Sequence, residues 1–343
     1  MRTGTPCLVL FCALAIQAAS AQHLILSAPT ARVAYASART DDTQEARRKE
    51  VERFVGEAER LIRGDDFNGK STAHYKLRTD DPRLEVSPAA DLLEAFRSYF
   101  ESFWSGRREL KTNDEPVLVF LFYSRSSLNK LLPGAPPPPD GVERVGHYQA
   151  FYDVIALHTD TVGPANLPDV LVHEAAHHLV ERRLLVSEHQ LSLWLSEGLA
   201  TYFGNTYRDT KGSWQTGQIG GKESWLFNDK TQRSGGDLSR ENLKLLKASL
   251  FKDNALGPDA ILRIDDPGRF YGEGATYHYA LSWILVHYML HADGGAHAPA
   301  FMKYLDAETR GEGGPEAFYK ETGLTPESLD AAFKLYAKKL RAR

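Results

Sequence analysis

The chain has 343 residues, 41 of them lysine or arginine and 45 aspartate or glutamate, with a formal net charge of −4. This balance lacks the basic excess that argues for binding to nucleic acid or to an anionic membrane surface, so neither is expected as a partner. The length exceeds that of a typical single core, so we expect one main domain with a helical extension.

Residues 1–21 have the pattern of a secretory signal peptide. An arginine precedes an apolar run over residues 7–16, and Ala19-Ser20-Ala21 forms an A-x-A cleavage site. The run is too short to remain as a membrane helix. Both cysteines lie in this segment, so the mature protein is predicted to have neither a disulfide nor a reactive thiol. We therefore expect a secreted or periplasmic protein without a membrane span.

Residues 22–65 are expected to form a lead-in and a charged amphipathic helix over 41–64, whose acidic and basic side chains are typical of a solvated face. A strand is predicted over 73–79, a helix over 88–104 and an apolar strand over 117–123. The helix has an aromatic stripe, which indicates core packing against the sheet rather than a ligand site. The stripe consists of Phe96, Tyr99, Phe100, Phe103 and Trp104.

Residues 124–146 are predicted to form a loop rich in glycine and proline. Its four consecutive prolines, at 136–139, favour a stiff extended chain. Residues 147–158 have the pattern of one strand. His147 and His158 lie at its ends, and we interpret both as surface or strand-end histidines rather than ligands, because neither has the spacing of a metal ligand.

The most informative segment is H-E-A-A-H at residues 173–177, in an apolar helix-forming stretch that follows Asn166, a suitable N-cap. At about 100° per residue, the side chains of His173 and His177 project about 40° apart, so both can bind one metal ion. Glu174 lies beside them and can act as the general base that takes a proton from a metal-activated water. This pattern is typical of a zinc hydrolase.

A catalytic zinc ion usually has three protein ligands and an open position. The metzincin continuation is excluded, because the chain has Val180 and Arg183 where that motif has glycine and histidine. Glu197 is the better candidate, since it lies in a second predicted helix, W-L-S-E-G-L-A at 194–200, with mostly apolar neighbours. A carboxylate on such a face needs a partner, and a zinc ion held by two imidazoles can provide it.

Residues 205–237 are rich in glycine, serine, asparagine and lysine and have weak periodicity, so we expect a lid or rim of the cleft. The C-terminal part is predicted to be helical. The expected helices cover residues 239–253, 275–290, 299–307 and 326–342.

The H-E-x-x-H run followed by a glutamate on a second helix resembles the gluzincin zinc metallopeptidases. Residues 178–196 separate the two motifs, which is within the spacing of that group, and S-E-G-L-A is similar to the E-G-x-A variant of aminopeptidase-like members. The thermolysin-like variant has aspartate four residues after the ligand glutamate, where this chain has Thr201, so the partner of one ligand histidine stays unassigned. Over residues 70–340 the layout resembles uncharacterised secreted bacterial metallopeptidases of that clan.

This resemblance implies a single Zn²⁺ ion bound by His173, His177 and Glu197, with Glu174 as the catalytic base. The implied fold is α+β and zincin-like, with a small mixed sheet, an active-site helix and a mainly helical C-terminal part. The catalytic domain would cover residues 66–210, and a helical subdomain that completes the cleft would cover residues 211–343.

The resemblance also implies a tyrosine or histidine that stabilises the oxyanion from a later helix. Tyr279 fits that pattern best, and packing of an amphipathic helix is the alternative explanation for its position. The competing candidates are Tyr271, Tyr277 and His278. By the same resemblance, residues 148–154 could offer a sheet edge to an extended substrate, although an ordinary strand explains them equally well.

We therefore expect a secreted zinc-dependent metallopeptidase that hydrolyses peptide bonds in peptides or proteins. No G-x-M-E-N-like segment precedes the zinc helix, which favours an endopeptidase over an aminopeptidase. Two alternatives stay open. One is a secreted zinc-binding or peptide-binding module of the same fold without catalytic turnover. The other is a metal-free structural or interaction protein.

Overall fold

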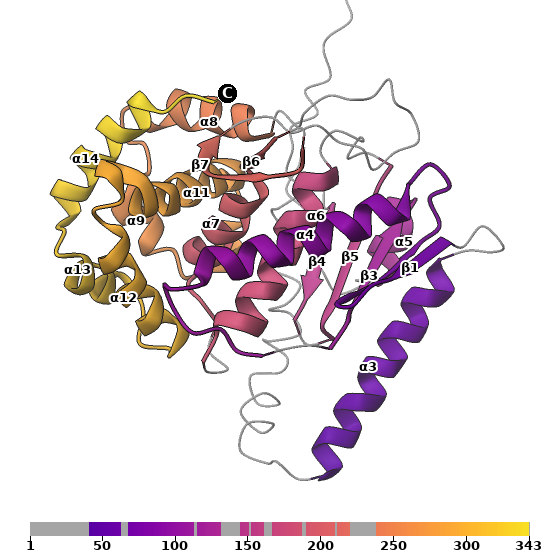
Figure 1. Cartoon of the computed structure of the whole chain (residues 1–343). Coiled ribbons are helices and arrows are strands. Elements are labelled where there is room, and N and C mark those ends of the chain that lie inside the picture. Colours follow the sequence, from indigo (N-terminus) through magenta and orange to yellow (C-terminus); the bar gives the residue numbers. More distant parts are fainter. Residues whose placement is uncertain are drawn as a thin grey trace, which may run out of the picture.

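The computed structural model describes most of the chain after residue 40 (Figure 1). The described residues are 41–62, 68–112, 115–131, 145–150, 152–160, 167–186, 190–209, 211–219 and 238–342. The predicted signal peptide, Asn166 and the four consecutive prolines lie outside these ranges. The described part combines a small mixed sheet with a mainly helical C-terminal region, which confirms the expected α+β class.

Five strands form one mixed sheet with the order β1-β2-β3-β5-β4. They are β1 (Asn68–Ser71), β2 (Tyr75–Thr79), β3 (Val117–Phe122), β4 (Gly146–Gln149) and β5 (Val154–His158). β2, β3 and β5 run parallel, whereas β1 and β4 pair antiparallel with their neighbours and form the two edges. β2 and β3 lie within predicted strands. β1 escapes prediction because its sequence, N-G-K-S, is exposed throughout and has no apolar alternation.

The prediction of one strand over residues 147–158 is wrong. The chain reverses between Gln149 and Val154, and β4 and β5 form an antiparallel hairpin. Asp153 has a φ of 54° in this turn, a left-handed conformation that aspartate tolerates better than most residues. Apolar residues continue through the turn, so the hydrophobic pattern of the sequence does not show that the strand is interrupted. The range 148–154 is therefore not one edge strand, because β4 lies at an edge of the sheet whereas β5 lies inside it, between β3 and β4.

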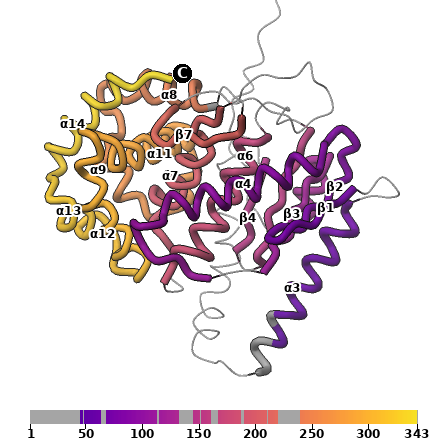
Figure 2. The backbone as a smooth tube through the Cα atoms, in the orientation of Figure 1, coloured from indigo at the N-terminus to yellow at the C-terminus, as the bar shows by residue number. Residues whose placement is uncertain are grey.

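Helices cover both faces of the sheet (Figures 1 and 2). α4 (Val86–Trp104) and α6 (Leu167–Leu179) pack on one face, and α3 (Asp41–Leu61) and α5 (Arg125–Leu131) on the other. On β3, Val119 and Leu121 join the core on the α4 side, whereas Phe120 joins a second cluster with Phe54 of α3. Alternate residues of a strand point to opposite faces, so both faces are buried. α5 lies within the range predicted as a loop.

The aromatic stripe of α4 lies in the core, as predicted. It also anchors a hairpin that the sequence does not predict, β6 (Thr206–Arg208) and β7 (Trp214–Ile219). The rings of Trp214 and Tyr99 stack with centroids 5.1 Å apart, and the Tyr99 hydroxyl pairs with Oγ1 of Thr216 at 2.9 Å. The described part of the expected lid is thus fixed to α4, and residues 220–237 lie outside the described ranges.

The C-terminal helices surround α11 (Ala275–His291), whose side chains are buried on nearly all sides. α7 (Leu193–Gly204) packs directly on α11. The others are α8 (Leu238–Leu250), α9 (Pro258–Leu262), α10 (Pro267–Phe270), α12 (Ala298–Thr309), α13 (Pro315–Thr322) and α14 (Pro326–Lys339). The four predicted helices correspond to α8, α11, α12 and α14, whereas α9, α10 and α13 are too short for a clear apolar period. One hydrophobic cluster continues from the sheet into this group.

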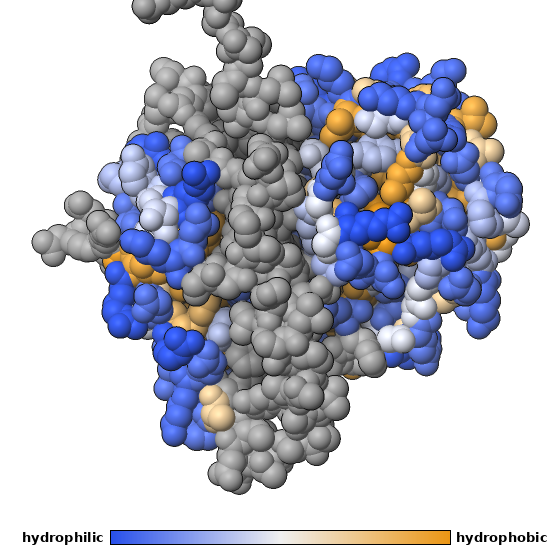
Figure 3. Space-filling view, turned by 180° about the vertical axis from the view of Figure 1, so that it is seen from behind, coloured by the Kyte–Doolittle hydropathy of each residue, from blue (hydrophilic) through white to orange (hydrophobic). Residues whose placement is uncertain are grey.

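The part of the surface that is coloured in the view from behind is mainly hydrophilic, with smaller apolar areas (Figure 3). The exposed large apolar side chains lie on separate segments, at Tyr123, Val186, Phe251 and Leu335. None of the described helices combines the length and apolar character that crossing a bilayer requires.

Candidate metal centre

Helix α6 carries the H-E-A-A-H run through the interior, between the sheet and α7. Its residues are all buried except His177. The helix continues as a π-helical turn, Val180–Leu184. Because neighbours hold α6 on several sides, its side chains have fixed directions, and the rings of His173 and His177 lie with centroids 4.7 Å apart.

Two glycines allow α7 to bring Glu197 against α6. A β-carbon at Gly204 would lie 3.2 Å from the carbonyl oxygen of Asp169 on α6. A β-carbon at Gly198 would lie 2.8 Å from the carbonyl oxygen of Ser282 on α11, closer than real side chains come. The glycine that follows the glutamate in S-E-G-L-A therefore permits α7 to pack tightly on α11 while Glu197 faces α6.

Three ligand-type atoms converge where α6 meets α7. Nε2 of His173 and Nε2 of His177 are 3.1 Å apart, and Oε2 of Glu197 lies 3.4 Å from each. The side chains of His173 and Glu197 are 2% and 1% exposed, and that of His177 is 10% exposed. In the part of the chain that the structure describes, this group of histidine and acidic side chains could hold a metal ion.

The spacing of these atoms fits a tetrahedral ion. Zinc binds imidazole nitrogen and carboxylate oxygen at about 2.0–2.2 Å, which places tetrahedral ligand atoms about 3.3–3.5 Å from one another. The observed separations of 3.1 and 3.4 Å are close to this range. Oε2 of Glu197 makes no well-formed hydrogen bond with a described residue. A cation between the three atoms would offset the cost of burying this oxygen.

Burial and charge act against each other at these side chains. Burial lowers the pKa of His173 to about 4, although Glu197 opposes the shift. Burial alone would raise the pKa of Glu197, but the adjacent imidazoles, above all His177, lower it to about 2. For His177 burial acts to lower the pKa, but the charge and hydrogen bond of Glu197, together with the charges of Glu174 and Glu181, raise it overall. At neutral pH Glu197 is therefore ionised and His173 neutral, as metal ligation requires.

A second pair of histidines, four residues apart on a helix, shows that this spacing alone does not direct two ring nitrogens at one point. His287 and His291 lie one turn apart on α11, and their ring centroids are also 4.7 Å apart. Nδ1 of His287 accepts a hydrogen bond of 2.6 Å from the Tyr336 hydroxyl, and its Nε2 donates to the Gly217 carbonyl at 3.1 Å. Nε2 of His291 pairs with the Tyr202 hydroxyl at 2.8 Å. These nitrogens point at hydrogen-bonding partners rather than at a common centre.

Glu174 is completely buried and acts electrostatically on His177. It does not belong to the group of ligand-type atoms. Gly146, the first residue of edge strand β4, lies directly against it, because a β-carbon at Gly146 would be 2.9 Å from Oε1 of Glu174. The carboxylate thus lies against the sheet edge and close enough to His177 to raise its pKa. The sequence offers no signal for this role of Gly146 beyond its place at a strand end.

Two of the four candidate oxyanion donors lie near the three converging atoms. The hydroxyl of Tyr271 donates a hydrogen bond of 2.9 Å to Oε1 of Glu197. Tyr279 is 3% exposed, and its ring centroid lies 6.5 Å from that of His173. The other two candidates bond to backbone carbonyls elsewhere, the Tyr277 hydroxyl at 2.7 Å and Nδ1 of His278 at 2.7 Å.

Ser196 is the side chain that lies behind His177. Its Oγ is 3.3 Å from Nδ1 of His177, a position that suits a group that orients a ligand imidazole. Oγ1 of Thr201, which stands where the thermolysin-like variant has aspartate, makes no hydrogen bond with a described residue. The partner that the sequence leaves unassigned is therefore not supplied by residue 201.

His178 belongs to a network behind the site that sequence reasoning does not find. Its Nδ1 donates to Oδ1 of Asp153 at 3.0 Å, and the Tyr148 hydroxyl donates to the same oxygen at 3.0 Å. Arg182 pairs with Oδ2 of Asp153 at 3.1 Å. The network ties the β4–β5 hairpin to α6 one residue after His177.

His147 and His158 lie outside the group of three converging side chains, and the prediction that they could lie on the surface is wrong because the sheet and its helices enclose both. Both are buried, and Nδ1 of His158 pairs with Asp160 at 2.6 Å.

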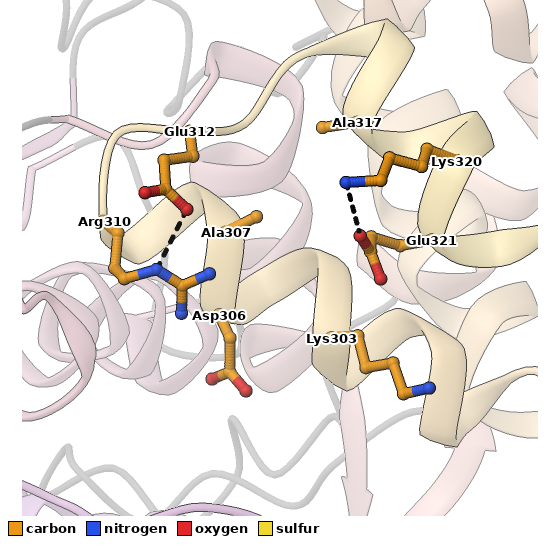
Figure 4. Close-up of a pocket in the computed structure, with 8 residues that line it drawn as sticks. All are labelled: Lys303, Asp306, Ala307, Arg310, Glu312, Ala317, Lys320 and Glu321. Atoms are coloured by element: carbon orange, nitrogen blue, oxygen red, sulfur yellow. Dashed lines mark hydrogen bonds and ion pairs between the residues drawn. The ribbon is translucent and has the colours of Figure 1, made fainter.

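A separate hollow of about 330 Å³ lies between α12 and α13 (Figure 4). Arg310 and Glu312 pair across 3.0 Å at its rim, and Lys320 and Glu321 across 3.6 Å. Positive and negative side chains balance, so the hollow shows no preference for one charge. It is lined by Lys303, Asp306, Ala307, Arg310, Glu312, Ala317, Lys320 and Glu321, none of which belongs to the group of three converging side chains.

Comparison of the chain with protein-family models and with curated proteins finds no match. The case for a function therefore depends on the geometry and chemistry of the side chains described above.

Proposed function

We propose that this chain is a zinc-dependent metallopeptidase of the gluzincin type with a zincin-like fold. One observation carries the proposal, which is the convergence of Nε2 of His173, Nε2 of His177 and Oε2 of Glu197 within 3.4 Å of one another. Two imidazoles and one carboxylate are a ligand set of hydrolytic zinc enzymes. The buried carboxylate of Glu174 next to this set supports a hydrolytic rather than a purely structural site.

The protein groups have separate roles in this proposal. A bound zinc ion would polarise the substrate carbonyl and lower the pKa of a water molecule. His173, His177 and Glu197 hold the ion, and Glu174 takes the proton of the attacking water and returns it to the leaving amine. The complete burial of Glu174 excludes bulk water from its carboxylate and so favours proton transfer within the site.

Tyr279 is the proposed donor to the oxyanion that forms at the substrate carbonyl. Its support is its burial and the approach of its ring to His173. A phenol hydroxyl near the carbonyl would supply a preorganised hydrogen bond to the developing negative charge. Tyr271 is a less suitable donor, because its hydroxyl is already directed at Glu197.

An extended peptide is the proposed substrate, and β4 is the proposed site of pairing. β4 uses one edge to pair with β5, and the sheet order places it at the end of the sheet. Backbone groups at a sheet edge can bind an extended peptide by adding it as a strand. Because Gly146 at the start of β4 lies against Glu174, a peptide bound along β4 would pass close to the base.

The proposed location is outside the cytoplasm, in the periplasm or the medium, on the basis of the signal-peptide pattern in residues 1–21. Endopeptidase activity is proposed because no sequence segment suited to binding a free amino terminus precedes the zinc helix. A zinc-binding or peptide-binding module without turnover is the second candidate.

The experiment that tests the proposal combines metal analysis with peptide cleavage. The protein is purified without a histidine tag, its metal content is measured, and it is incubated with a peptide library before and after chelation. We expect about one zinc ion per chain and cleavage that chelation abolishes. Full zinc occupancy without cleavage would favour the binding module, and absence of bound metal would reject both the peptidase and the zinc-binding form of that module.

A further inference from the structure

We infer that Tyr271 is a positioning residue for the metal site. Its hydroxyl holds Oε1 of Glu197 so that Oε2 stays directed at the two histidine nitrogens, and it thereby sets the affinity for zinc. The inference rests on the proposed metal centre and adds a determinant that neither motif of the sequence contains.

The two oxygens of Glu197 face different groups. Oε2 lies 3.4 Å from Nε2 of His173 and 3.4 Å from Nε2 of His177. Oε1 accepts the 2.9 Å hydrogen bond from the Tyr271 hydroxyl. The carboxylate is therefore held from both ends, and rotation about its last bond would break the hydrogen bond to Tyr271.

The backbone of Tyr271 is fixed, so its hydroxyl has little freedom to move. Helix α10, which immediately precedes it, is capped by Asp266, whose side chain accepts from the amide of Arg269 at 2.7 Å. The amide of Tyr271 donates to the carbonyl of Pro267 at 2.8 Å. Nδ1 of His278 on α11 donates to the carbonyl of Phe270 at 2.7 Å. Two helices thus hold the residue from which the phenol extends.

A neutral donor suits this position. Glu197 is 1% exposed, so water can contribute little to the solvation of Oε1. A lysine or arginine there would neutralise the carboxylate and compete with a metal cation for it, whereas a phenol supplies a hydrogen bond and leaves the negative charge available. Groups that orient a ligand from behind in this way often change metal affinity by 10- to 100-fold when they are removed.

The decisive experiment is a zinc-affinity measurement on Tyr271→Phe, by competition with a chromophoric chelator and without substrate. We expect the affinity to fall about 10- to 100-fold, because only the hydroxyl that holds Oε1 is lost. Tyr277→Phe is the matched control, since it removes a hydroxyl that bonds to the carbonyl of Leu256 instead. An affinity of Tyr271→Phe equal to that of the control would overturn the inference.

A double-mutant cycle separates positioning from general destabilisation. In a Glu197→Ala background the partner oxygen is gone, so Tyr271→Phe should cause no further loss of zinc affinity. An equal loss in both backgrounds would contradict a role through Glu197. Thermal melting of the metal-free proteins, compared with Tyr277→Phe, checks that each variant is folded.

The inference and the proposed function can fail separately. A wild-type chain that binds zinc with Tyr271-dependent affinity but cleaves no peptide would support the inference and reject the peptidase. A wild-type chain that binds no zinc would overturn both.

Discussion

The backbone of Gly146 lies against the carboxylate of Glu174, so that a β-carbon at residue 146 would stand 2.9 Å from Oε1 and 3.1 Å from Cγ of the glutamate. This contact joins the edge of the sheet to the proposed base. Any side chain at residue 146 would have to displace Glu174, which is completely buried and has little room to move.

Gly146→Ala should therefore slow catalysis without removing the metal. Displacement of a catalytic group by about 1 Å can cost about 100-fold in rate, so we expect kcat to fall about 10- to 100-fold while zinc content is unchanged. Steady-state peptide cleavage and metal analysis of the same preparation test this. The control is Gly56→Ala on α3, where a β-carbon meets nothing within 4 Å. Equal rates for the two variants would show that the contact has no role in catalysis.

Glu174→Gln should keep zinc bound and lose turnover. The amide has the shape of the carboxylate but cannot take a proton from water, and general bases typically contribute about 10²- to 10⁴-fold. The residual cleavage rate and the zinc content are measured together. Turnover at the wild-type rate would reject Glu174 as the base.

Glu197→Ala should weaken zinc binding and the stabilisation that zinc provides. A ligand that binds only the folded state raises the melting temperature, and the rise depends on affinity. We expect wild type to melt higher with added zinc than after chelation, and the variant to show a much smaller difference. A variant with undiminished zinc-dependent stabilisation would point to a different third ligand.

Gly198→Ala should destabilise the metal-free protein, because the new methyl group would meet the carbonyl of Ser282 at 2.8 Å and Cγ2 of Val286 at 2.9 Å. Overpacking of this kind typically costs about 1–3 kcal/mol in free energy of unfolding. Urea denaturation of the chelated protein measures the change. In contrast, Gly56→Ala should be neutral or slightly stabilising, since it replaces an unhindered helical glycine. The tight packing of α7 on α11 would be refuted if both variants behaved alike.

Asp153→Asn should reduce the dependence of stability on acidic pH. Burial acts to raise the pKa of Asp153, but hydrogen bonds and charges from His178 and Arg182 outweigh it and lower the pKa from 3.8 to about 2. A carboxylate whose pKa is lowered by folding stabilises the native state above its unfolded pKa and loses that contribution as pH falls toward the folded value. The shift corresponds to about 2 kcal/mol.

The measurement is the free energy of unfolding at pH 7 and at pH 2–4. We expect the Asp153→Asn substitution to cost about 2 kcal/mol at pH 7 and progressively less as pH falls toward 2, because protonation of the wild-type carboxyl removes the same contribution. Asparagine is suited to the comparison because it tolerates the positive φ at this position. A cost that is the same at all pH values would mean that the charge of Asp153 is not what stabilises the hairpin.

The sequence predicts the centre of this protein better than its surroundings. The i, i+4 spacing in α6 and the apolar context of Glu197 are local properties of helices, so the two histidines and the glutamate can be anticipated to come together. The turn at Asp153 could not be predicted, since apolar residues run through it. The hairpin of β6 and β7 could not be predicted either, since its strands have no strong alternation of apolar and polar residues. These elements are determined by packing against α6 and α4.

The same limit applies to the tyrosines. Position after the second helix favours Tyr279, but which phenol reaches Glu197 depends on the route of the chain through α10, a helix of four residues that periodicity cannot predict. Likewise Ser196, rather than Thr201, lies behind His177 because of how α7 is rotated against α6. Contacts between helices decide these roles. A sequence motif describes the residues of a single helix, so it does not predict such contacts.

The close packing of α7 on α11 also indicates how much of the chain is required for metal binding. The last residue of the proposed metal-binding motif is Glu197. Tyr271 and α11, against which α7 packs, come from the last third of the sequence. A fragment cut after α7 would retain every signature residue and lose the surface that orients its carboxylate. A version of this protein that ends after α7 should therefore bind metal poorly although it still contains the complete motif.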